Sequence, residues 1–148
     1  MKYLTGSEII SLLENIVYEK TQVHEYSVDI TVSEIYRISS GAELDFGGSE
    51  FKPAVKEKIE PVKKDTKDKY GWWELDEGYY QFKFNEILTL SDGQRAVIQP
   101  HPHLRESGAF HNTLAIEESG SIYMPVAVME KTSIKENART SEMRIWEG

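Results

Sequence analysis

Hydrophobic and polar residues alternate along most of this chain with the period of two that is typical of β-strands. The clearest run begins at Val28, where Val28, Ile30 and Val32 fall on one face. Comparable runs, separated by turn residues, span residues 43–46, 79–85, 87–90, 95–98, 113–116, 122–129, 132–134 and 139–146. Many short strands joined by frequent turns predict a mainly β protein, built as a barrel or a sandwich.

A helical period occurs only near the N-terminus. Apolar residues at positions 9, 10, 12, 13 and 16 repeat with helical spacing. Thr5 precedes them, and Glu8 follows Thr5 by three positions, which is the pattern of a capping box. The sequence therefore predicts one short amphipathic helix over about residues 7–15.

The most polar stretch, residues 52–70, contains seven lysines, four acids and two prolines. Its weak periodicity predicts a solvated loop or ragged hairpin on the surface. Lys63-Lys64 leaves an alternative open, a patch that steers an anion. Trp72-Trp73 follows this stretch, and such a pair typically covers a core edge or a subunit interface, with base stacking as the alternative.

Composition then narrows the class of protein. The 148 residues suit a single domain, residues 1–148. The net charge of −8 argues against nucleic acid as a partner, because phosphate binding needs a basic surface. No apolar run approaches the roughly 20 residues of a membrane span, and the first residues lack the apolar region of a signal peptide. With no cysteine as well, we expect a cytoplasmic protein that binds neither nucleic acid nor membranes.

Residues 94–120 hold three of the four histidines. On a strand His101 and His103 would share a face, so both could contact one metal ion. Glu106 and His111 are close enough in sequence to complete the ligand set. The alternative is that these histidines lie on a polar turn and form hydrogen bonds with the backbone.

The acid pair Glu117-Glu118 ends the apolar strand predicted at residues 113–116. Partial burial at such a position can tune a carboxyl group for general-base catalysis. An exposed acidic turn is the alternative. The chain has no Walker A loop, G-x-G-x-x-G, G-x-S-x-G or Cys-His arrangement, which excludes most of the familiar nucleotide, hydrolase and kinase sites.

Three segments occur in a characteristic order. Residues 26–30 place a small residue and Asp29 at the start of a strand, Asp76-Glu77-Gly78 precedes another strand, and residues 134–143 have the form of a late motif that usually ends in Arg-Ile-Ala-Gln. This order resembles the superfamily of dUTPases and dCTP deaminases, especially its archaeal members, over nearly the whole chain. The resemblance implies a compact dUTPase-like β-barrel or β-clip with one short N-terminal helix.

The resemblance also implies a hydrolase of deoxynucleoside triphosphates, which converts dUTP to dUMP and pyrophosphate or deaminates dCTP. It implies a homotrimer with sites between subunits and Mg²⁺ as the cofactor. Aligned through Gly108-Ala109, Glu117 occupies the position of the catalytic acid, and Asp29 is implied as a metal contact. The implied nucleotide-binding residues are His101, His103, Arg105, Ser107, Gly108, Thr113, Arg139 and Glu142.

The second motif of the family departs most from the pattern. Its Arg-Ser-Ser-Leu, which gathers the phosphates, reads His101-Pro102-His103-Leu104 here. Pro102 has neither a hydroxyl nor an N–H to donate, and Glu106 replaces a downstream arginine and so reverses its charge. Two alternatives therefore stay open: a catalytically inactive trimer that binds a nucleotide or a protein, and a β-barrel metalloprotein with His101 and His103 as ligands.

Overall fold

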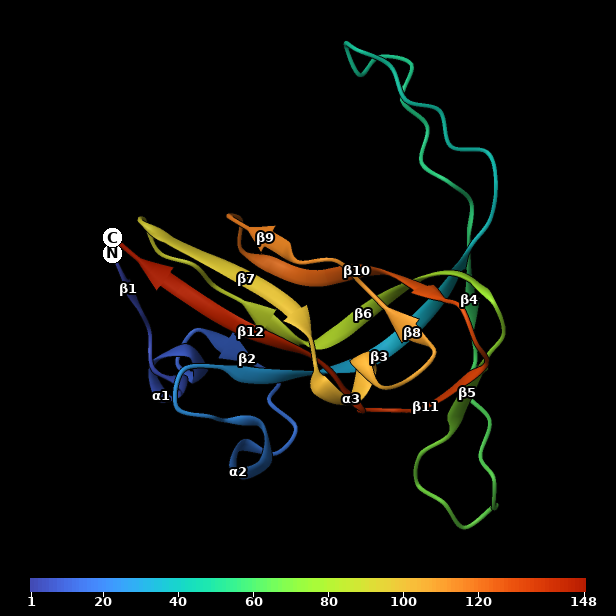
Figure 1. The fold of residues 1–148 in the computed structure, drawn as a ribbon, viewed down its shortest axis with the longest axis horizontal. Helices are drawn as coiled ribbons and strands as arrows, with labels where there is room; N and C mark the ends of the chain where they lie inside the picture. Colours follow the sequence, from blue (N-terminus) through green and yellow to red (C-terminus); the bar gives the residue numbers. More distant parts are fainter.

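A curled, ten-stranded antiparallel sheet forms the body of the molecule (Figure 1). The computed structural model describes residues 1–148. Neighbouring strands of the sheet follow the order β8-β10-β6-β3-β12-β7-β9. These strands are β3 (Val28–Ile38), β6 (Gly78–Leu88), β7 (Gln94–Pro100), β8 (Ala109–Phe110), β9 (Leu114–Ile116), β10 (Gly120–Val128) and β12 (Arg139–Glu147). The mainly β prediction is confirmed.

Alternation along β6 shows why these residues form the sheet. Tyr80, Phe82, Phe84, Glu86 and Leu88 point inward and are buried, while residues 79, 81, 83, 85 and 87, which alternate with them, are more exposed. A strand with one apolar face buries that face against the curled sheet. The first half of β3 is different, because residues 28–32 are buried on both faces, so the polar residues that alternate there, including Asp29, lie inside the protein.

The predicted N-terminal helix is shorter than expected. Helix α1 (Gly6–Ile10) has the predicted capping box, with Thr5 and Glu8 exchanging hydrogen bonds. It ends at Ile10 because Leu13 is buried as part of strand β2 (Leu13–Glu14), which pairs with β6. Strand β1 (Lys2–Tyr3) precedes the helix and pairs with β12.

Two further one-turn helices were not expected from the sequence: α2 (Glu19–Gln22) and α3 (Pro102–Arg105). Each has only four residues, too few to display a helical period. The longest helix of the chain has five residues, so none is long or apolar enough to cross a membrane.

The chain leaves the sheet in two excursions between β3 and β6. The first forms the long arm of Figure 1 over about residues 41–55, and a single bridge between Glu43 and Lys52 joins its two sides. The strand predicted at residues 43–46 is therefore wrong. Strand β4 (Lys56–Ile59) then pairs with β3, and residues 60–70 form a polar loop. The stretch 52–70 is mostly exposed, as the predicted solvated loop requires, but it contributes β4 to the main sheet and forms no hairpin of its own.

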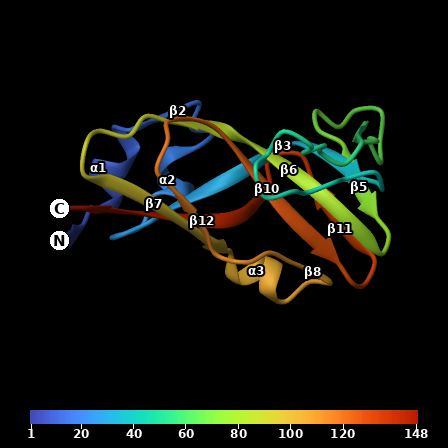
Figure 2. The same ribbon diagram turned by 90° about the horizontal axis from the view of Figure 1, so that it is seen from above.

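A separate two-stranded sheet closes one end of the molecule (Figure 2). It joins β5 (Trp72–Leu75) to β11 (Thr132–Lys135). Trp73 is buried, and its indole N–H donates to the carbonyl of Ile59 at 2.9 Å. Trp72 is only half-buried on the other side of the same strand, so the two tryptophans have different surroundings.

Candidate functional site

Asp29 is the centre of a charged cluster inside the protein. Pairing of β12 with β3 brings Arg139 to it, and the Arg139 Nη1 donates to Asp29 Oδ2 at 3.0 Å. The Nε2 atoms of His24 and His101 lie 2.9 Å and 3.4 Å from the same oxygen. Asp29 is fully buried, and its Oδ1 has no hydrogen-bond partner. One carboxylate oxygen thus holds groups from three separate segments.

His101 links this cluster to helix α3. It is the N-cap residue, and its Nδ1 accepts a hydrogen bond from the backbone N–H of His103 at 3.0 Å. A neutral imidazole that accepts at Nδ1 carries its proton on Nε2, which faces Asp29. Burial lowers the pKa of His101, and the negative charge of Asp29 partly opposes that shift. His101 therefore fits a neutral donor to Asp29.

The expectation that His101 and His103 share the face of a strand is wrong, because Pro102 begins a helical turn between them. Their rings pack edge to face, with centroids 4.7 Å apart. His111 lies elsewhere, with its ring nitrogens 2.7 Å from the Asn112 carbonyl and 2.8 Å from Ser141 Oγ. The hydrogen bond to the Asn112 carbonyl is of the kind that the non-metal alternative predicts.

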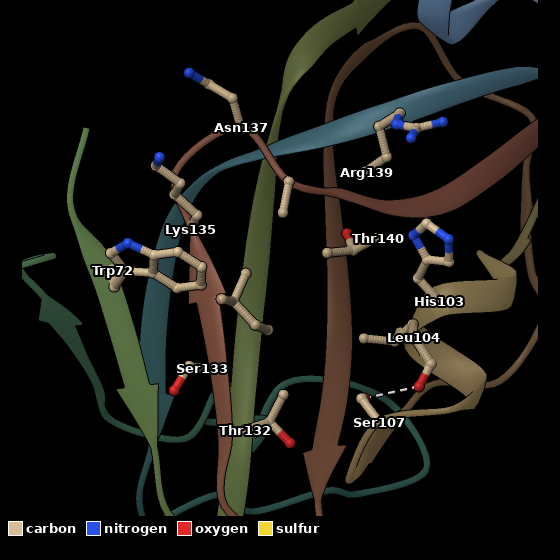
Figure 3. A pocket seen from close by; sticks show the side chains of 12 residues that line it. Trp72, His103, Leu104, Ser107, Thr132, Ser133, Lys135, Asn137, Arg139 and Thr140 are labelled. Atoms are coloured by element: carbon tan, nitrogen blue, oxygen red, sulfur yellow. Dashed lines mark hydrogen bonds between the residues drawn. The ribbon is translucent and has the colours of Figure 1, made fainter. Parts of the chain in front are cut away.

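A cavity of about 390 Å³ opens beside the cluster, between α3 and the strands β5, β11 and β12 (Figure 3). Three of its lining residues carry basic side chains, and none carries a carboxyl group. The lining residues are Trp72, His103, Leu104, Ser107, Thr132, Ser133, Ile134, Lys135, Asn137, Ala138, Arg139 and Thr140. In a chain with 25 acidic residues, a cavity whose ionisable lining residues are all basic suits an anion.

The structure gathers part of the predicted nucleotide set at this cavity. His103, Ser107 and Arg139 line it, and Figure 3 shows His103 and Arg139 on the same side of it. Gly108 adjoins Ser107, and its N–H donates to the lining residue Thr132 at 3.2 Å. These predicted residues come together because α3, β11 and β12 meet here.

The other predicted residues lie outside the cavity lining. Arg105 is exposed on α3, and Glu142 on β12 pairs in register with Asp29 and Gln99. Thr113 belongs to a second depression, of about 280 Å³, next to His111. Glu117 is exposed just after β9, in a shallow third depression. A single chain therefore does not bring Glu117 into the cavity, and its catalytic role stays a prediction.

Sequence reasoning missed a second buried acid, Glu86. Its two carboxylate oxygens accept from the Thr31 N–H at 2.8 Å, the Thr31 hydroxyl at 2.6 Å and Gln22 Nε2 at 2.9 Å. Burial raises the pKa of Glu86, and the hydrogen bonds from Thr31 and Gln22 oppose the rise. The only sequence signal was an acid at an inward position of an alternating strand.

The residues around Asp29 do not fit a magnesium ion. Mg²⁺ prefers an octahedral set of oxygen ligands that includes waters, but Asp29 is fully buried and its Oδ2 already has nitrogen atoms of His24, His101 and Arg139 within 3.4 Å. Nowhere in the chain do three or more His, Asp or Glu side chains converge as a metal site. Metal contacts by Asp29, or by His101 and His103, stay predictions.

Comparison with known proteins bears on this site. No protein-family model matches the chain. A probable deoxyuridine 5'-triphosphate nucleotidohydrolase of Methanosarcina mazei is 30% identical over an alignment of 141 positions that covers 89% of this chain and 76% of that protein. The chain belongs to the dUTPase and dCTP deaminase superfamily.

Other members of the superfamily agree with this assignment. A probable deoxyuridine 5'-triphosphate nucleotidohydrolase of Methanosarcina acetivorans is 33% identical over 110 residues, which cover 74% of this chain and 60% of that protein. The crystal structure of a 2'-deoxycytidine 5'-triphosphate deaminase from Agrobacterium tumefaciens superposes with a TM-score of 0.70 at 16% identity. That match covers 99% of this chain and 48% of the deaminase chain, and it confirms the fold.

Proposed function

We propose that this protein is a hydrolase of the dUTPase type that cleaves a deoxynucleoside triphosphate to the monophosphate and pyrophosphate. Membership in the superfamily places it in deoxynucleotide metabolism. The observation that carries the proposal is the cavity, which has His103, Lys135 and Arg139 in its lining and no carboxylate. Such a lining compensates the charge of a polyphosphate in a chain with a net charge of −8.

Arg139 is the first phosphate ligand that we propose. Asp29 accepts from its Nη1, which fixes the guanidinium group and leaves further N–H donors free for a phosphate. Glu106 occupies the position where the family has an arginine. It is the exposed C-cap residue of α3 and does not line the cavity. Besides His103 of the second motif, the phosphates would therefore contact Lys135 and Arg139, which lie outside that motif.

Glu117 is the general base in this proposal, supplied to the cavity by a neighbouring subunit of a homotrimer. It would take a proton from a water molecule whose oxygen forms a bond to the α-phosphorus. The bond from that phosphorus to the bridging oxygen then breaks, and its electron pair leaves with pyrophosphate. Magnesium bound to the nucleotide would neutralise part of the phosphate charge.

A non-catalytic nucleotide-binding trimer is the second candidate. The observation in its favour is Pro102 at the first position of α3, where the family has a residue that donates hydrogen bonds to phosphate. Pro102 keeps the helical turn but has no donor. Turnover distinguishes the two candidates.

The test is a turnover screen of dUTP, dCTP and the other deoxynucleoside triphosphates, with and without magnesium. We expect pyrophosphate release, and we expect Glu117→Gln to lower kcat by about 10²-fold or more, as loss of a general base does. Glu118→Gln is the matched control, because Glu118 is the adjacent exposed acid. Release of ammonia from dCTP would show that the protein is a deaminase and not a hydrolase of the phosphate chain. No turnover by a folded trimer would contradict the proposed hydrolase. Unchanged activity of Glu117→Gln would remove Glu117 from the mechanism and leave the hydrolase itself in place.

A further inference from the structure

Two excursions leave the same end of the molecule in opposite directions, one on either side of β4 (Figure 1). Residues 41–55 form the arm, and residues 61–70 form a second excursion that we call the lysine loop. A single bridge, between Glu43 and Lys52, joins the two sides of the arm, and a ribbon of only two strands is marginally stable by itself. The arm therefore receives little support from its own chain.

The tip of the arm has a defined shape that presents apolar side chains to solvent. Asp45 Oδ2 accepts the backbone N–H groups of Gly48 and Glu50, both at 3.1 Å, which closes the tip into a turn. Phe46 is fully exposed there, and Phe51 is more than half exposed. Large apolar side chains gathered on one exposed segment mark an interaction surface, and aromatic side chains are typical anchors of such surfaces.

The arm and the lysine loop carry opposite charges. The arm contains three acids and one lysine, and that lysine, Lys52, forms a salt bridge of 3.5 Å with Glu43 of the arm itself. The lysine loop contains four lysines and two acids. Because like charges repel across an interface, an acidic arm fits this loop better than it fits most of the surface of a chain with a net charge of −8.

The lysines of the loop have no carboxylate partner. Both acids of the loop are engaged within it, since Asp65 accepts the N–H of Lys67 at 2.9 Å and Asp68 accepts the N–H of Asp65 at 3.1 Å. All four lysines are exposed, and none forms a salt bridge. Val62 is also exposed, so the loop offers an apolar contact beside its positive charge.

We infer that the arm of one copy docks on the lysine loop of a second copy of this chain. Phe46 and Phe51 are the apolar anchors, Val62 lies against them, and the acids of the arm face the lysines of the loop. Within one chain the two segments point away from each other (Figure 1), so the contact forms between copies. It joins two different surfaces and is therefore heterologous, which allows it to close a ring such as a trimer.

A single introduced thiol can locate the docking surface, because the chain contains no cysteine. Ser49→Cys, at the exposed tip of the arm, is labelled in the full chain with a photoreactive benzophenone maleimide and irradiated. We expect covalent dimers in which the crosslinked peptide lies within residues 61–70. Asp92→Cys, in an exposed turn between β6 and β7, is the matched control and should give no crosslink to the loop.

Two outcomes of the crosslinking would overturn the inference. One is a set of crosslinks confined to a single chain, and the other is a set of dimers joined at surfaces other than the lysine loop. In a cell extract, crosslinks to a different protein in place of dimers would likewise overturn a second copy as the partner.

Light scattering over a dilution series measures how much the arm contributes to association. Phe46→Ser combined with Phe51→Ser should raise the concentration at which oligomers dissociate about tenfold or more, as loss of aromatic anchors does. Both side chains lie outside the hydrophobic core, so the variant should keep its fold. Tyr18→Ser, which changes an exposed aromatic residue outside both segments, is the matched control. An unchanged dissociation concentration in the doubly substituted arm would contradict the docking.

Exchange of charges tests the pairing of the two segments. Glu50→Lys on the arm should weaken association about threefold, and Lys63→Glu with Lys67→Glu on the loop should restore most of the loss when combined with it. Lys20→Glu is the control, because Lys20 is an exposed lysine of α2 without a salt bridge, and it should give no such rescue. Equal effects of the loop and control substitutions would overturn the loop as the docking surface.

The inference goes beyond the proposed function, and the two fail in different ways. No residue of the arm or the lysine loop lines the cavity, and crosslinking needs no turnover. Crosslinks from the arm to the loop in a protein that cleaves no deoxynucleotide would retain the interface and reject the hydrolase. Turnover of dUTP by a protein without such crosslinks would retain the hydrolase and reject the interface.

Discussion

At the scale of single residues, two buried acids organise the polar interior. Asp29 holds Arg139, His24 and His101 on one carboxylate oxygen, and Glu86 accepts three hydrogen bonds from Thr31 and Gln22. Gln22 joins the two, because its Nε2 also donates to the backbone carbonyl of Asp29 at 2.9 Å. The positions of Arg139 and α3 beside the cavity therefore depend on buried hydrogen bonds as well as on apolar packing.

Glu86 leads to a prediction about pH. Burial raises its pKa above the ordinary value of 4.5, so the folded state holds this proton to higher pH than the unfolded state does. The resulting stabilisation is complete below about pH 4.5 and is lost as pH rises through the raised pKa. The stability of the wild type relative to Glu86→Gln should therefore fall over that window, by at most about 1.4 kcal/mol per pH unit.

Urea unfolding at several pH values measures this difference directly. Glu57→Gln is the control, since Glu57 is exposed on β4 and should show no such trend. If the free energy of unfolding of the wild type instead rose relative to that of Glu86→Gln as pH increased, the folded state would lower the pKa of Glu86 and the prediction would be wrong.

The sequence could identify Asp29 but not its partners. Asp29 stands in a recognisable motif, whereas Arg139 lies 110 positions away and reaches it only through the pairing of β12 with β3. His24 lies in a loop with no periodic pattern. Side-chain contacts of this kind depend on strand register, which hydrophobic alternation alone does not set between distant strands.

At the scale of elements, the turn after α3 is packed against the turn between β10 and β11. The Gly108 carbonyl accepts the N–H of Met129 at 2.7 Å and that of Glu130 at 3.3 Å. A Cβ atom on Gly108 would lie 2.3 Å from the Glu130 carbonyl oxygen. This close approach holds α3 against the strand that forms the opposite wall of the cavity.

Gly108→Ala should therefore destabilise the protein by about 2–3 kcal/mol, because the new methyl group overlaps fixed backbone atoms. Gly47→Ala is the matched control, since a Cβ there meets nothing within 4 Å, and it should leave the free energy of unfolding nearly unchanged. Thermal or urea unfolding compares the two. Equal stability of both variants would show that the turn shifts freely and does not hold α3.

The strands were predictable where one face is buried, as in β6, β10 and β12, because burial enforces the period of two. The predictions were wrong where something other than the hydrophobic period determines the local structure. Leu13 belongs to strand β2 although its spacing is helical, since pairing with Leu88 buries it. Residues 43–46 alternate, yet they lie on an arm with no sheet beside them, where Leu44 and Phe46 are exposed.

At the scale of the whole molecule, one chain holds only part of the proposed site. The cavity gathers His103, Ser107 and Arg139, while Glu117 and Thr113 line separate depressions. The family resemblance predicted the residue types, but the sequence of one chain contains no signal for contacts between copies. In the proposed mechanism, a neighbouring subunit brings Glu117 to the cavity.

The most direct measurement is subunit complementation between two inactive variants, Glu117→Gln and Arg139→Gln. The two variants are co-expressed with different tags and purified as mixed trimers. Random assembly of a closed trimer unites an intact Glu117 with an intact cavity in about one site of four. The mixed trimers should therefore regain about a quarter of the wild-type dUTPase activity. Each variant alone should remain inactive, with its trimer confirmed by light scattering. Mixed trimers that stay as inactive as either parent would contradict a site shared between subunits.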